Sequence, residues 1–111
     1  MERFVHDQNL MRYLDLLESE TDSAKRGQLR KLLLEEVDRF GDHSDQLYET
    51  DRLVARCTAR LQEQKSLLAH AREDGRDAGA SEDVLANMSQ TLALIVGHRR
   101  TILDRLDRTG L

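Results

Sequence analysis

In FGDHSDQLYETDRLVARCTARLQEQKSLL, residues 40–68, an apolar side chain recurs at every seventh position. These positions are occupied by Phe40, Leu47, Val54, Leu61 and Leu68. Apolar residues at this period lie along one stripe of an α-helix, and such a stripe is stable only when it packs against another one. The stretch therefore predicts a long helix that needs a packing partner.

A second apolar ladder follows closer to the C-terminus and is interrupted only at Arg99. Its members are Leu85, Met88, Leu92, Ile95, Ile102 and Leu106. Residues 74–80, DGRDAGA, contain Gly75 and Gly79 and form the clearest linker of the chain. Two long helices joined by so short a connection are expected to fold back as an antiparallel hairpin.

The N-terminal part predicts shorter helices. We expect helical segments over residues 9–20, 22–40, 44–73 and 81–109, with 74–80 as the linker. Asn9, Asp22 and Ser81 are the expected N-caps, and residues 1–7 are an expected irregular lead-in. The fold class is therefore all-α: one domain over residues 1–111, an elongated helical bundle built on a coiled-coil-like antiparallel hairpin.

The segment from Gly41 to Asp45 has two interpretations. Gly41 can end one helix, and Ser44 or Asp45 can cap the next. The seven-residue spacing, however, continues unbroken from Leu33 through Phe40 to Leu47. A single helix that is continuous or bent near Gly41 would preserve that spacing, and the intact phase favours it.

Composition supports an all-helical fold and limits the possible partners. The chain has no Pro, 4% aromatic residues and 34% charged residues. Its net charge is −4, and a mildly acidic chain is not expected to bind nucleic acid, which requires a basic surface.

The longest apolar run, Leu92–Val96, is too short to cross a membrane. Cys57 has no partner for an intramolecular disulfide, which favours a reducing, cytoplasmic location.

Candidate chemical residues are few. His6, in VHDQNL, and His98, in GHRR, faintly resemble the phosphoacceptor histidines of histidine-kinase dimerisation helices, but neither is followed by the further residues of those motifs. Glu35, Glu36 and Asp38 are expected to form a solvated helix face. We find no pattern for a catalytic site or a bound metal, so the sequence predicts no enzyme activity and no cofactor.

Residues 9–36, NLMRYLDLLESETDSAKRGQLRKLLLEE, resemble a segment of small uncharacterised bacterial proteins, mostly from proteobacteria. The resemblance covers about a quarter of the chain. It implies a helix–turn–helix segment that turns at Glu20-Thr21-Asp22 and a bacterial cytosolic setting. It implies no activity.

These features predict a small protein–protein interaction module. Its expected partner is a second copy of itself, as a homodimer through the two stripes, or a helix of another protein. One alternative is a secretion or flagellar-export chaperone, which would hold an amphipathic helix in a groove. Another, from a different class, is a histidine phosphorelay component that uses His98 or His6.

Overall fold

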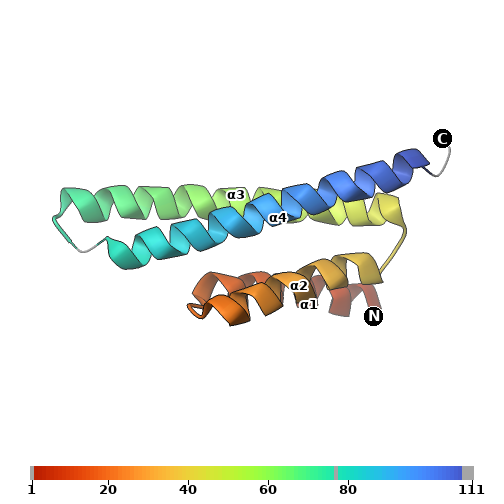
Figure 1. The fold of residues 1–111 in the computed structure, drawn as a ribbon, viewed down its shortest axis with the longest axis horizontal. Helices are drawn as coiled ribbons and strands as arrows, with labels where there is room; N and C mark the ends of the chain where they lie inside the picture. The colour runs from red at the N-terminus through yellow and green to blue at the C-terminus, as the bar shows by residue number, and fades with distance from the viewer. Residues whose placement is uncertain (1, 77, 109–111) are drawn as a thin grey trace.

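The computed structural model describes residues 2–76 and 78–108, which form α-helices joined by short turns (Figure 1). The helices are α1 (Glu2–Ser19), α2 (Ser23–Arg39), α3 (His43–Glu73) and α4 (Gly79–Arg108). The described residues contain no β-strand, so the predicted all-α fold is confirmed. Within the same ranges, no helix combines the length and the apolar character needed to cross a membrane.

The helices form two hairpins of different length. The long hairpin pairs α3 with α4, and the short hairpin of α1 and α2 lies along one side of it (Figure 1). The end of the long hairpin near the α3–α4 connection projects beyond the short one. The molecule is therefore elongated, with dimensions of 56 × 27 × 24 Å.

One apolar core joins the two hairpins. It consists of Leu10, Leu14, Leu17, Leu33, Val37, Leu53, Cys57, Ile95 and Ile102. Burial of a large aliphatic side chain contributes about 1.5–3 kcal/mol. Because all four helices contribute to this core, the short hairpin is an integral part of the fold.

The two apolar ladders pack within one chain. Leu61, Leu68, Met88, Ile95 and Ile102 are buried, and Leu47, Val54, Leu92 and Leu106 are partly buried against the core. Leu85 is also partly buried. Arg99 turns outward and pairs with Asp51 on α3. The ladders therefore form the seam of the α3–α4 hairpin.

The helix does not continue through Gly41, contrary to the interpretation that the apolar phase favoured. Phe40 is extended, Gly41 has a φ of 78°, and Asp42 caps α3 in a reciprocal capping box with Asp45. A left-handed residue such as Gly41 ends a helix. Phe40 precedes α3 and stacks on His6, so its place in the seven-residue spacing does not require a continuous helix.

Two predicted helix starts are wrong, and one is confirmed. α1 begins at Glu2, so Asn9 lies inside the helix and its side chain donates to Glu36. α4 begins at Gly79, two residues before Ser81. Asp22, by contrast, is the N-cap of α2 and accepts hydrogen bonds from the backbone amides of Ala24 and Lys25.

Candidate functional site

A histidine lies buried between two glutamates where α1 meets α2 and α3. The Nδ1 atom of His6 is 3.1 Å from Oε1 of Glu36, and its Nε2 atom is 2.7 Å from Oε2 of Glu49. His6 is 3% exposed, and both glutamates are equally buried. We call these three residues the His6 cluster. The His6 cluster links α1 to both α2 and α3.

Further side chains hold the cluster in place. Asn9 donates to Oε1 of Glu36 at 3.2 Å, and Arg39 forms an ion pair with Oε2 of Glu36 at 3.1 Å. The ring of Phe40 stacks on that of His6, with 5.2 Å between centroids. Glu36 is therefore bonded on both oxygens, and the imidazole is restrained at its edge and on one face.

The protonation of His6 decides how the cluster is bonded. Ionised carboxylates only accept hydrogen bonds, whereas a neutral imidazole has one donor and one acceptor. Donation to both glutamates therefore requires an imidazolium, with a proton on each ring nitrogen. A neutral ring that donates to Glu36 through Nδ1 instead directs the lone pair of Nε2 toward Glu49.

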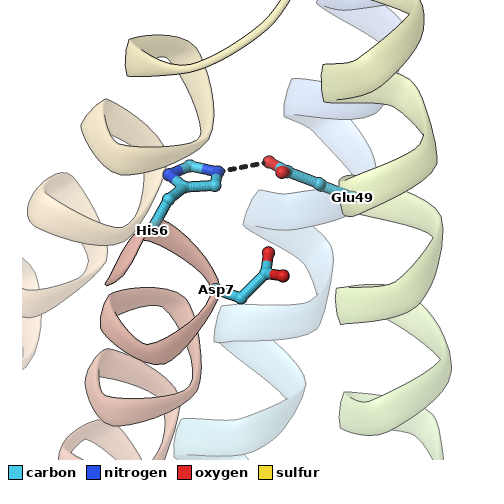
Figure 2. A group of neighbouring side chains, drawn as sticks. All are labelled: His6, Asp7 and Glu49. Atoms are coloured by element: carbon cyan, nitrogen blue, oxygen red, sulfur yellow. Dashed lines mark hydrogen bonds and ion pairs between the residues drawn. The ribbon is translucent and has the colours of Figure 1, made fainter. Parts of the chain in front are cut away.

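A third carboxylate lies near the Nε2 side of the ring (Figure 2). His6, Asp7 and Glu49 each offer one potential ligand atom, and these atoms all lie within 4.8 Å of one another. Asp7 is partly buried. The sequence analysis predicted no metal-binding group, because these residues come from α1 and α3 and have no recognisable spacing.

An open hollow lies on the other side of the His6 cluster, beside Glu36. It has a volume of about 460 Å³ and is lined by Glu2, Val5, His6, Asn9, Glu36, Arg39 and Phe40. Val5 and Phe40 supply apolar walls, while His6 and Glu36 lie buried at its base. Such a combination of apolar walls and a few convergent polar groups is typical of binding sites.

The second histidine singled out by the sequence lies elsewhere. Nε2 of His98, on α4, is 2.9 Å from Oδ1 of Asp38, and the His98 side chain is 12% exposed. Arg105 approaches the same carboxylate at 3.8 Å. His98 and His6 therefore contact different acidic residues of α2 and do not form a common site.

The arginines beside the α3 ladder contact the acidic residues of α1. Arg56 pairs with Asp15 at 3.2 Å, and Arg60 pairs with Glu18 at 2.9 Å. The Arg56–Asp15 pair is exposed and contributes little stability, whereas the Arg60–Glu18 pair is partly buried. They nevertheless orient the short hairpin on the long one.

The burial of Glu36 and Glu49 was not predicted from the sequence. Glu36 was expected on a solvated face, but it lies beside Leu33 and Val37 and is as buried as they are. Glu49 similarly precedes the buried Leu53 by one helical turn. A polar residue at an apolar-stripe position is the signal that could have identified both glutamates.

Comparison of the chain with protein-family models, with curated proteins and with solved structures finds no match.

Proposed function

We propose that this protein is a small protein–protein interaction module that accepts an apolar side chain of its partner in the hollow beside His6. The hollow itself is the observation that supports this role. Its wall includes Val5, which is 50% exposed, and its base is polar and buried. An apolar anchor would bury Val5 and Phe40, while the polar base would select how the partner is oriented.

The proposed partner is an amphipathic helix of another protein. Leu61, Leu68, Ile95 and Ile102 are buried inside one chain, so they are not free to form a homodimer. Self-association would have to use the exposed apolar residues instead. These are Phe4, Val5, Leu16, Tyr48, Leu67, Leu94 and Val96. Of these residues, Val5 lines the hollow.

Binding accounts for the site better than phosphotransfer does. Both ring nitrogens of His6 face carboxylates, and the side chain is buried. An incoming phosphoryl group would be repelled by Glu36 and Glu49 at short range. The Nε2 atom of His98 is likewise held by a carboxylate.

We also propose that the protein acts in the cytoplasm, as a binding protein without catalytic activity. The free thiol of Cys57 is buried, and burial raises its pKa to about 11. A thiol of this kind is a packing group rather than a nucleophile, and a free cysteine is typical of a reducing compartment.

A matched pair of variants tests the proposal. Val5 and Val96 have nearly equal exposure, 50% and 48%, but only Val5 lines the hollow. The wild type, Val5→Glu and Val96→Glu would each carry a C-terminal tag, which leaves α1 free, and would capture proteins from a lysate of the native host under reducing conditions. Mass spectrometry would then identify and quantify the bound proteins.

We expect one stoichiometric partner to bind the wild type and Val96→Glu, and about tenfold less of it to bind Val5→Glu. The reason is that the variant places a carboxylate against the partner's apolar anchor, at a cost of about 1.4 kcal/mol. Circular dichroism should show that both variants fold. Equal capture by all three proteins, or capture of no partner at all, would contradict the proposal.

A further inference from the structure

We propose that Nε2 of His6 and the carboxylates of Asp7 and Glu49 bind a divalent transition-metal ion, with Zn²⁺ as the best fit. These three groups face one another between α1 and α3 (Figure 2), with their ligand atoms within 4.8 Å. The site uses the Nε2 side of the ring, whereas the hollow lies on the side of Glu36. The inference therefore goes beyond the proposed function and does not depend on it.

The required adjustment of the side chains is small. Zn²⁺ binds imidazole nitrogen and carboxylate oxygen at about 2.0–2.2 Å, which places tetrahedral ligand atoms roughly 3.4 Å apart. Nε2 of His6 and Oε2 of Glu49 are now 2.7 Å apart, so this pair has to open by about 0.7 Å. Asp7 is only partly buried, and its ligand atom, within 4.8 Å of the other two, has to approach by up to about 1.4 Å.

Glu36 prepares the ring for this role. Its Oε1 atom lies 3.1 Å from Nδ1 of His6, and it is itself held by Asn9 and Arg39. Histidines that bind metals typically donate their second ring N–H to a carboxylate, which fixes the tautomer and the ring orientation. With its proton on Nδ1, His6 directs the Nε2 lone pair toward Asp7 and Glu49.

The charges also balance when the ion is bound. Arg39 neutralises Glu36, which leaves Asp7 and Glu49 with two negative charges. An imidazolium would compensate only one of them, whereas a divalent ion with a neutral imidazole compensates both. Glu49 gains most from this compensation, because it is buried and a buried charge is costly unless it is paired.

The mixture of ligands indicates the class of metal. Imidazole nitrogen suits Zn²⁺, Fe²⁺, Cu²⁺ and Ni²⁺, while Ca²⁺, Mg²⁺ and Mn²⁺ prefer oxygen ligands. Among these ions, Zn²⁺ suits a tetrahedral site of imidazole and carboxylate ligands, whereas Cu²⁺ and Ni²⁺ favour square-planar or tetragonal sites. The ion would connect α1 to α3, so its binding free energy would add to the stability of the fold.

Isothermal titration calorimetry of the whole, tag-free, metal-free chain with Zn²⁺ tests the inference. We expect one Zn²⁺ per chain for the wild type. Affinity should fall at least tenfold in Asp7→Asn and be lost in His6→Gln. Glu36→Gln should retain the stoichiometry and lose about tenfold or more in affinity, because it affects the metal only through the ring.

Two controls make the result decisive. His70→Gln removes an exposed histidine of α3, and Val96→Glu adds a carboxylate at an exposed position of α4, so both should bind Zn²⁺ as the wild type does. Asp7→Asn changes a partly exposed residue, so it provides the deciding comparison where a buried variant fails to fold. Absence of Zn²⁺ binding by the wild type, or equal affinity in Asp7→Asn and the wild type, would overturn the inference.

Discussion

His6, Glu36 and Glu49 occupy positions where the pattern of their helices calls for apolar side chains. His6 precedes the buried Leu10 by four residues, and Glu36 stands next to Val37 on the buried face of α2. Charged residues are seldom fully buried unless they are paired. Sequence alone could not show this pairing, because the partners of His6 lie 30 and 43 residues away.

Cys57 illustrates the opposite case, because its burial can be predicted from the sequence. Its place between Val54 and Leu61 predicts a buried thiol, and the structure confirms the burial. Burial disfavours the thiolate and raises the pKa of the thiol to about 11. The neutral thiol therefore contributes stability below the ordinary pKa of 9.0, and this contribution is lost as the pH rises toward 11.

We expect Cys57 to react slowly with iodoacetamide at pH 8 and about tenfold faster for each pH unit up to about 10, because the thiolate is the reactive form. In urea the rate at pH 8 should be roughly 100-fold higher, given a difference of about two pKa units. Mass spectrometry of timed samples measures both rates. Rapid labelling of the folded protein at pH 7 would contradict the burial.

At the scale of elements, the turn between α2 and α3 shows what a periodic pattern leaves undecided. The seven-residue spacing indicates which residues can share one stripe. It does not indicate whether the backbone turns between them. The local signals were present in Gly41 and Asp42, which form the left-handed residue and the N-cap. The linker near Gly75 was easier to predict because no apolar residue continues the stripe through it.

Gly41→Ala should destabilise the protein by about 1–2 kcal/mol, because a left-handed backbone is unfavourable for alanine. Its new Cβ would also lie 2.7 Å from Cβ of Asp45, which is one partner in the α3 capping box. Urea denaturation followed by circular dichroism measures the change.

Gly27→Ala provides the matched control. Gly27 lies within α2, and an added Cβ there would meet nothing within 4 Å. Alanine is favoured over glycine in a helix, so this variant should gain about 0.5–1 kcal/mol. If the two substitutions changed the free energy of unfolding in the same direction, the turn at Gly41 would be described incorrectly.

At the scale of the whole molecule, the short hairpin completes the core of the long one. The apolar stripes of α3 and α4 can be covered by the N-terminal helices or by a second chain. The structure places Leu14, Leu17 and Leu33 in one cluster with Leu53 and Ile95. Periodicity could not decide between these partners, because either would present a similar apolar face.

A fragment of residues 43–108 should therefore associate with itself. Without α1 and α2, the fully buried Leu53, Ile95 and Ile102 would become exposed on one face of the hairpin, and such a patch promotes association. Light scattering coupled to gel filtration should find a dimer or larger species, with a melting temperature that depends on concentration. A monomeric fragment as stable as the intact chain would contradict a shared core.

The shared core also affects how the protein folds as it leaves the ribosome. α1 and α2 emerge first, yet the residues against which their apolar face packs include Ile95 and Ile102, close to the end of α4. At a synthesis rate of about 5–20 residues per second, that face stays uncovered for several seconds. During that time the apolar face of the first hairpin is open to association with other apolar surfaces.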